Sequence, residues 1–423
     1  MGRRQGSESE LLTYNYLTEC LACGGKELKQ YLDLGRQVFA NTYPKEYRVD
    51  SVLPSAPLQV NLCLDCYHSQ LSVIANPKEL FRDYLYVSGT TKDLADHFRS
   101  LVTQSLPMKP VDQISVLDIG ANDYSLLREF KRRGCKVEGV DPASNLADRA
   151  GDIPALVDFW GMKTWYRVKQ APYDLITGLN VFAHNLNPLE FLQACREVLK
   201  PAGKILLEMP TIKHTLQGNK VGQIYHEHIS YFSIHSMIKL VERAGMRITD
   251  LVDLPHIHEG TTRFIIENGS GAHSPKVQQA MLVELIAGLE DFETYKFFGD
   301  TVKANIRQLE ELLRGFKSKG VRVVAYGASA KLSTLLGAFK DDPKKSIDYI
   351  VDNNSLKVGR HQTNTEIPIL PPESMKVDQA GLVILITPDN FFREIQQHLT
   401  DMNLGDRVSL IRYVPTVTVE ELN

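Results

Sequence analysis

The chain has 423 residues, a length that suits two or three domains rather than a single core. Its hydrophobic content of 43%, charged content of 23% and net charge of −3 are those of an ordinary soluble globular protein and give no basic footprint for nucleic acid. No apolar run approaches the roughly 20 residues that span a bilayer, and the first dozen or so residues form a polar lead-in without the apolar segment of a secretory signal. We therefore expect a cytoplasmic protein with no membrane or nucleic-acid partner, and no protein partner is evident.

Four of the six cysteines form two Cys-x-x-Cys pairs near the start of the chain, namely Cys20/Cys23 and Cys63/Cys66. In a reducing compartment this doubled spacing predicts a tetrahedral zinc site with four thiolate ligands rather than disulfides. Four thiolates leave no open position for a substrate, so we expect a structural zinc ion. Buried unpaired thiols are the alternative, but they would not explain the doubled spacing.

Strands and helices alternate through the middle of the chain. Apolar strand patterns at 115–120, 136–143, 173–184 and 204–210 are separated by helical patterns, the clearest of which begins at Pro188. This order predicts a doubly wound parallel sheet. Helices are expected over 275–318, and a second, smaller strand–helix pattern then runs from 321 to 388.

The predicted fold class is therefore α/β, with a small zinc-binding head, a central Rossmann-like domain and a smaller C-terminal Rossmann-like α/β domain. The expected boundaries are 13–88 for the head, 89–272 for the central domain, 273–318 for a helical connector and 319–423 for the C-terminal domain.

Acidic residues stand at the carboxyl ends of the first two central strands. Asp118 and Gly120 close one strand and Asp141 ends the next. Ligands of parallel sheets bind outside these ends, and an acidic residue after the second strand accepts hydrogen bonds from the ribose of an adenosine cofactor. Ala-Asn-Asp-Tyr follows Gly120 and lacks the further glycines that a pyrophosphate needs. We therefore predict S-adenosylmethionine, whose cationic end suits Asp118 or Asp123; a sheet without a cofactor is the alternative.

Two histidines, a glutamate and two tyrosines lie together in YHEHISYF, residues 225–232. Histidine is the natural base near neutral pH, and a neighbouring carboxylate can orient it or raise its basicity. A metal site on His226 and His228 lacks an evident third ligand, and a polar aromatic edge without chemistry is a further alternative. We favour an acid–base site.

Nearly the whole chain resembles the three-domain sugar-nucleotide C-methyltransferases that act on 4-keto-6-deoxy sugars. Besides the four cysteines, the matching stretches are LDLG (32–35), DYLYVSG (83–89), LDIGANDYSLL (117–127), NVFAH (180–184), IYHEHISYFS (224–233), HEGTTR (258–263), YGASAK (326–331) and VDNNSLKVGR (351–360). The resemblance implies methyl transfer from S-adenosylmethionine to C3 of a nucleotide-linked 4-keto-6-deoxy sugar through an enolate.

The resemblance also implies roles for individual residues. It makes His228 the general base, with Glu227 holding the sugar or supporting proton transfer. The keto oxygen would be polarised by Tyr225, His184 and one of Tyr84 and Tyr86. Donor binding is implied for Asp118, Gly120, Asn122, Asp123, Asp141 and Asn180, and further substrate contacts for His258, Arg263 and Lys331, with the diphosphate between the two α/β domains.

Three positions depart from the family pattern. Tyr124 stands where the family usually carries glycine, Glu259-Gly260 replaces a pair of glycines, and residues 387–390 read Thr-Pro-Asp-Asn where the family favours a Trp-Asn pair. Two alternatives follow from these departures. One is a sugar-nucleotide-binding protein whose donor pocket Tyr124 blocks, and the other is a sugar O-methyltransferase.

Overall fold

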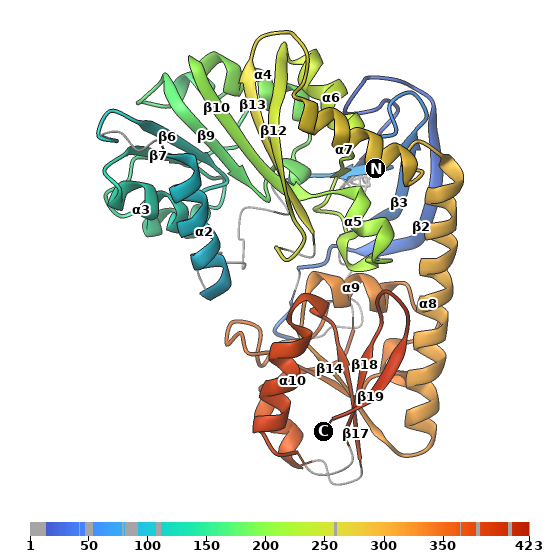
Figure 1. Ribbon diagram of the computed structural model, residues 1–423. Coiled ribbons are helices and arrows are strands. Elements are labelled where there is room, and N and C mark those ends of the chain that lie inside the picture. Colours follow the sequence, from blue (N-terminus) through green and yellow to red (C-terminus); the bar gives the residue numbers. More distant parts are fainter. Residues whose placement is uncertain are drawn as a thin grey trace, which may run out of the picture.

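The computed structural model contains four β-sheets connected by helices (Figure 1). It describes residues 14–41, 43–46, 54–77, 80, 92–106, 111–257, 260–363, 365–377, 381–404 and 408–422. The predicted α/β fold class is confirmed.

The head is built on an antiparallel sheet with the strand order β11-β4-β3-β2. Three of these strands come from the start of the chain: β2 (Leu28–Val38), β3 (Ser55–Cys63) and β4 (Ser69–Leu71). The fourth, β11 (Ser230–Tyr231), follows the histidine cluster of residues 225–228 directly. The cluster is therefore tied to the head as well as to the central domain. A separate pair joins β1 (Tyr14–Tyr16) to β5 (Val73–Ala75).

The central sheet has seven strands in the order β12-β13-β10-β9-β6-β7-β8. Five are parallel: β6 (Ser115–Ile119), β7 (Lys136–Val140), β8 (Ala155–Leu156), β9 (Tyr173–Leu179) and β10 (Leu199–Pro210). Two more, β13 (Thr261–Asn268) and β12 (Met246–Leu254), extend the sheet in antiparallel fashion. Its helices are α2 (Lys92–Ser105), α3 (Ser125–Arg132), α4 (Pro188–Val198), α5 (Ile212–Gln217) and α6 (Ile234–Arg243).

Local sequence signals explain where two of these helices begin. Asn187 accepts a hydrogen bond from the Glu190 backbone and is followed by Pro188, so α4 starts there. Ser233 and Ser236 form a reciprocal capping box that starts α6 immediately after the histidine cluster and β11. The direction in which the chain leaves the cluster is thus fixed.

The C-terminal sheet has the order β16-β15-β14-β17-β18-β19 and is parallel except for its last strand. Its strands are β14 (Arg322–Tyr326), β15 (Tyr349–Val351), β16 (Ile369–Leu370), β17 (Leu382–Ile386), β18 (Val408–Arg412) and β19 (Thr418–Glu421), with helices α9 (Ala330–Gly337) and α10 (Phe392–Asp401).

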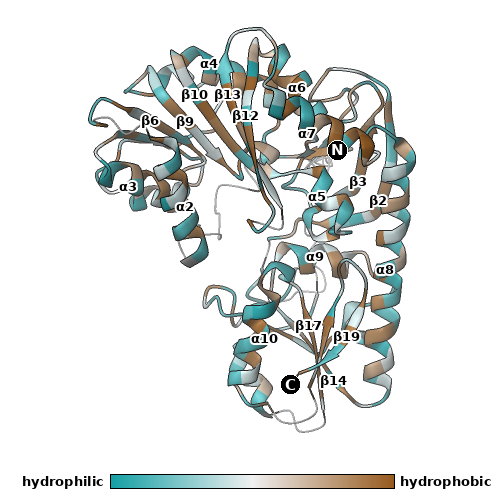
Figure 2. Ribbon diagram, viewed as in Figure 1, coloured by the Kyte–Doolittle hydropathy of each residue, from teal (hydrophilic) through white to brown (hydrophobic). Residues whose placement is uncertain are grey.

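The helices expected over 275–318 form α7 (Pro275–Ile286) and the long α8 (Phe292–Ser318). Figure 1 shows α8 running along the side of the molecule from the head to the C-terminal sheet, and it contacts both β2 and β14. Gly299 lets α8 approach the head, because a Cβ at this position would lie 2.2 Å from the Tyr31 carbonyl oxygen. Figure 2 shows that hydrophobic residues are frequent on the strands of both large sheets, and many of them are buried.

Candidate active site

The predicted donor-binding residues meet where β6 and β7 end. The Gly120 backbone donates to the Val140 carbonyl at 2.8 Å. The backbone N–H groups of Asn122 and Ala143 each donate to a different oxygen of Asp141, both at 2.8 Å. A Cβ at Gly120 would lie 2.9 Å from the Cβ of Val181, so the loops after β6 and β9 approach closely only because this residue is glycine. The structure therefore brings Gly120, Asn122 and Asp141 together at one sheet edge.

Asp118 lies within β6 and is 4% exposed. Thr177 donates a hydrogen bond of 2.6 Å to its carboxyl group. Burial, together with the negative charges of Asp141 and Asp123, raises the pKa of Asp118 to about 7. A cation placed beside this group would favour its ionised form.

Asn180 is the last of the residues predicted to bind S-adenosylmethionine. This residue has a left-handed backbone (φ 54°), which asparagine adopts more readily than most residues. Its side-chain oxygen is buried and has no hydrogen-bond partner among the described residues, so it is an acceptor that a bound ligand could satisfy. Three carboxylates, an amide oxygen and a loop with one glycine suit a cationic nucleoside better than a pyrophosphate.

Tyr124, the departure from the family pattern, is a core residue. It is 1% exposed and belongs to an apolar cluster with Ala121 and Leu127. Its ring lies on β7, where a Cβ at Gly139 would be 2.7 Å from the ring edge. Burial and the nearby charges of Asp141 and Asp118 raise its pKa to about 12, so the phenol stays protonated.

Residues 225–228 form a turn between a short 3₁₀ helix, η5 (Val221–Gln223), and β11. The Nδ1 atom of His228 lies 2.8 Å from the Gln223 carbonyl oxygen, which can only accept, so Nδ1 carries the proton. Nε2 of the neutral ring is then an acceptor, and the Tyr225 hydroxyl donates to it at 2.9 Å. The turn thus orients a basic nitrogen.

His184 lies beside this base, with the two ring centres 4.8 Å apart. It ends η4 (Phe182–His184), just after β9, and its Nδ1 donates to the Glu227 carbonyl at 2.7 Å. Burial lowers the pKa of His184 to about 4, so the ring is neutral near pH 7. The proton on Nδ1 is thus used to hold the turn, and the predicted contact of His184 with the keto oxygen stays a prediction.

The turn of residues 225–228 is held by all three parts of the chain. From the central domain, the Ala183 carbonyl accepts from the Ile229 backbone at 2.9 Å. From the C-terminal domain, Thr334 donates to the Ile224 carbonyl at 3.1 Å. From the head, the Asn41 side-chain amide donates to the Glu227 carboxylate. Sequence reasoning missed Asn41 and Thr334, because no local pattern marks contacts between residues so distant in the chain.

His226 points away from the base. Its ring packs edge-on against Phe39, with the centroids 5.1 Å apart, and its Nε2 lies 3.3 Å from the Pro57 carbonyl oxygen. Burial lowers its pKa to about 4. His226 is therefore a structural residue, and it shares no coordination geometry with His228.

The four cysteines converge as predicted, with Sγ atoms within 4.8 Å of one another. The pairs Cys20–Cys66 and Cys23–Cys63 are each separated by 3.6 Å between sulfur atoms. Tetrahedral zinc with Zn–S bonds of about 2.3 Å would require sulfur separations of about 3.8 Å, which fits this set. Across the described residues, no other group of three or more His, Cys, Asp or Glu side chains is placed to hold a metal ion.

The zinc knuckles are part of the central domain's packing. Cys20, Ala22 and Cys63 belong to the same buried apolar cluster as Phe232 and Leu240. Arg243, in the last turn of α6, also donates to the Ala22 carbonyl. Loss of zinc would therefore disturb more than the head.

Arg263 occupies a buried ion pair. It is 3% exposed, and its Nε donates to Glu208 at 2.6 Å across the β10–β13 pairing. Glu208 also lies 2.7 Å from the Nε2 of His97, and Arg263 reaches Gln104 at 2.8 Å, so the network docks α2 on the sheet. These contacts give Arg263 a structural role and leave it little exposed surface, and the predicted substrate contact at this residue stays a prediction.

The loop after β14 repeats the arrangement after β6. Gly327 donates to the Val351 carbonyl at 2.8 Å, and Asp352 accepts from the Ala328 backbone at 2.8 Å. In this second loop, however, the carboxylate has a positively charged side chain beside it, since the Lys357 Nζ lies 3.6 Å from Asp352. Lys331 is the second residue of α9, contacts Asn390 at 3.2 Å and passes over Gly222, close to the turn of residues 225–228. Sequence reasoning missed Lys357.

Three predicted substrate residues, Tyr84, Tyr86 and His258, lie outside the described residues. Among the residues that are described, no helix is long and apolar enough to cross a membrane.

Three family models match consecutive parts of the chain. A zinc binding domain matches residues 20–81, a methyltransferase domain matches 90–251, and a C-methyltransferase C-terminal domain matches 256–415. These matches agree with the predicted zinc-binding head and with S-adenosylmethionine-dependent methyl transfer.

Individual relatives agree with the family models. The C-methyltransferase NovU of Streptomyces niveus is 30% identical over 366 residues, which are 84% of this chain and 86% of that protein. The human mitochondrial ubiquinone biosynthesis O-methyltransferase is 25% identical over 146 residues, 32% of this chain and 39% of that protein. The magnesium protoporphyrin IX methyltransferase of Synechocystis PCC 6803 superposes on 42% of this chain and 83% of its own, with 13% identity and a TM-score of 0.33. Together, the match to NovU over most of both chains and the three consecutive domain models show that this chain belongs to the C-methyltransferase family.

Proposed function

We propose that the protein methylates C3 of a nucleotide-linked 4-keto-6-deoxy sugar through an enolate. The observation that carries the proposal is the oriented base, in which His228 holds its proton on Nδ1 and presents Nε2 beside the Tyr225 hydroxyl. When bound, S-adenosylmethionine supplies an electrophilic methyl group.

The 4-keto group makes the C3 proton acidic, and a base near neutral pKa can remove it. His228 Nε2 accepts this proton, which gives the enolate that methylation at carbon requires. Since the Nδ1 proton already has a carbonyl acceptor at Gln223, the imidazolium formed by this step is stabilised without any movement of the ring.

Negative charge develops on the C4 oxygen during this step and needs a donor. Tyr225 is the nearest candidate, because its hydroxyl must leave the Nε2 lone pair before this nitrogen can accept the C3 proton, and on turning away it can donate to the sugar oxygen. His184 holds the turn through the Glu227 carbonyl. Tyr84 or Tyr86 would add a second donor.

The nucleotide end would lie toward the C-terminal domain. Support comes from the glycine loop after β14 and from two cations near it, Lys331 and Lys357. The Lys331 side chain also lies over Gly222, so a substrate bound here could reach the turn of residues 225–228, which we call the catalytic turn. Asp118, Asp123, Asp141 and Asn180 would hold the donor on the other side.

The decisive test is to incubate the protein with S-adenosylmethionine and dTDP-, GDP- or CDP-linked 4-keto-6-deoxy sugars. We expect the product to gain one methyl group, and C3 to exchange its hydrogen with deuterated solvent when S-adenosylhomocysteine replaces the donor. Methyl transfer without C3–H exchange would favour O-methylation. Binding of the sugar nucleotide without turnover would favour a protein that has lost catalysis.

A further inference from the structure

A residue of the head reaches the catalytic turn. Asn41 lies just beyond β2, and its side-chain Nδ2 donates to the Glu227 carboxylate, 186 positions further along the chain. Glu227 is 2% exposed, so its carboxylate requires donors within the protein. Asn41 is one of them.

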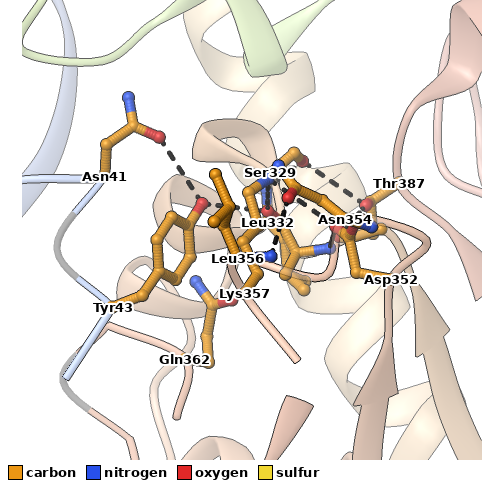
Figure 3. A network of polar contacts seen from close by, with 12 residues as sticks. Asn41, Tyr43, Ser329, Leu332, Asp352, Asn354, Leu356, Lys357, Gln362 and Thr387 are labelled. Carbon is orange, nitrogen blue, oxygen red and sulfur yellow. Dashed lines mark hydrogen bonds and ion pairs between the residues drawn. The ribbon is translucent and has the colours of Figure 1, made fainter. Parts of the chain in front are cut away.

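The orientation of the Asn41 amide follows from its two neighbours. An ionised carboxylate can only accept, so the amide nitrogen faces Glu227. The amide oxygen then faces the Tyr43 hydroxyl at 3.4 Å, and this hydroxyl lies closer, at 2.9 Å, to the Ala328 carbonyl to which it donates. Figure 3 shows the amide oxygen facing this hydroxyl while the amide nitrogen points away from it.

Tyr43 is itself held by contacts with the C-terminal domain. It is buried, and the negative charges of Asp352 and Glu227 add to the effect of burial, which holds its pKa far above the ordinary value. The phenol therefore keeps the proton that it donates. The Ala328 carbonyl also accepts from Lys357 at 2.6 Å, and the Lys357 Nζ lies 5.2 Å from the centre of the Tyr43 ring.

Another buried glutamate shows what a different partner does. Burial alone would raise the pKa of Glu208, but its contacts with His97 at 2.7 Å and with the permanently charged Arg263 at 2.6 Å lower it. Such a pair fixes a carboxylate as an anion. The Asn41 bond orients Glu227 without adding a positive charge, which suits a carboxylate that takes part in proton transfer.

We propose that Asn41 is a positioning residue for methyl transfer, which orients the Glu227 carboxylate within the turn that also carries His228 and which contacts Tyr43. The inference rests on the proposed function for its kinetic consequence. Through this contact the zinc-binding head contributes directly to the catalytic turn, and its strand β2 places the residue that does so.

The first experiment needs no sugar substrate. Carbon-13 NMR of protein labelled at glutamate carboxyl groups, with Glu227→Gln to identify the signal, should report the pKa of Glu227. A hydrogen bond to a charged group corresponds to about one to two pKa units, so Asn41→Ala should raise the Glu227 pKa by that amount. Gln59→Ala is the matched control, because Gln59 lies in the same head and donates its amide to Asp33 at 2.9 Å.

The second experiment measures turnover of the keto-sugar nucleotide that the wild-type protein accepts. Asn41→Ala should lower kcat about 10- to 100-fold with little change in the KM for S-adenosylmethionine. Combined with Glu227→Gln, it should cause little further loss, because both changes remove the same interaction. Tyr43→Phe should show a smaller effect in the same direction.

An unchanged Glu227 pKa in folded Asn41→Ala protein would overturn the inference, whether or not the wild-type protein methylates a sugar. Additive losses in the double variant would also overturn it. A raised Glu227 pKa in a wild-type protein that methylates no sugar nucleotide would uphold the contact and refute the proposed function instead.

Discussion

Donor binding should depend on pH through Asp118. Burial raises the pKa of this carboxyl group to about 7, far above its ordinary value of 3.8. The folded protein without donor therefore retains a proton on Asp118 that the unfolded chain releases at much lower pH. If the cationic donor binds beside the ionised carboxylate, binding must expel this proton, and affinity should weaken as pH falls below 7, approaching about tenfold per pH unit well below the pKa.

Isothermal titration calorimetry with S-adenosylmethionine between pH 5.5 and 7 tests this expectation. About 3% of Asp118 is ionised at pH 5.5 and about half at pH 7, so the dissociation constant should fall roughly 15-fold across the range. Titrations in buffers of different ionisation enthalpy should show the release of up to one proton. The range stops at pH 7, because the α-amino group of the donor titrates near 7.7–8.0.

Asp118→Asn is the matched control, since it keeps the size of the side chain and can still accept from Thr177. Its affinity should be weaker than that of the wild type at pH 7 and nearly constant across the same range. S-adenosylhomocysteine, which lacks the sulfonium charge, should show a shallower slope. A flat wild-type profile, or an equally steep profile in Asp118→Asn, would refute this account of the site.

Three further predictions concern catalysis, the metal and acid stability. His228→Asn should retain donor binding but lose turnover and C3–H exchange by roughly 10²–10⁴-fold, as measured by product mass spectrometry and NMR, and undiminished exchange would move the base elsewhere. Elemental analysis should give about one zinc per chain, and its removal by a chelator should lower the melting temperature of the central domain along with that of the head; a fully folded zinc-free protein would contradict this. Burial lowers the pKa of His184 and His226 to about 4 from 6.5, so the unfolded chain binds more protons between these values. The free energy of unfolding should therefore fall by up to about 3 kcal/mol per histidine as pH falls through this window, and urea titrations at pH 7 and pH 5 should resolve the change.

The features that were predictable from the sequence are those encoded by short spacings. The two Cys-x-x-Cys pairs predicted the sulfur cluster, because ligand spacing in a zinc knuckle is local. The ends of β6 and β7 were predictable for a similar reason, since strand length and the position of Asp141 follow from hydrophobic patterning. The grouping of residues 225–228 was also visible, because its members are neighbours in the chain, and its acid–base role stays a prediction.

Contacts between distant segments were not predictable in this way. Asn41 precedes Glu227 by 186 positions, and nothing in its immediate sequence indicates that contact. Arg263 matched a family stretch, yet its guanidinium pairs with Glu208 on the neighbouring strand. The role of His184 depends on which ring nitrogen faces a carbonyl, which is a matter of geometry rather than of residue type.

Tyr124 shows how a departure from a family pattern can be absorbed without a change in chemistry. Its backbone is left-handed (φ 63°), a conformation that costs a non-glycine residue about 1–2 kcal/mol. Burial of the ring against Leu127 and the bare backbone of Gly139 offsets this cost. The ring occupies space that a β-carbon at 139 would otherwise need, so the two residues form a matched pair. Since Tyr124 is accommodated in the core, Asp118 and Asp141 keep their places at the sheet edge, and we expect donor binding to depend on them rather than on residue 124.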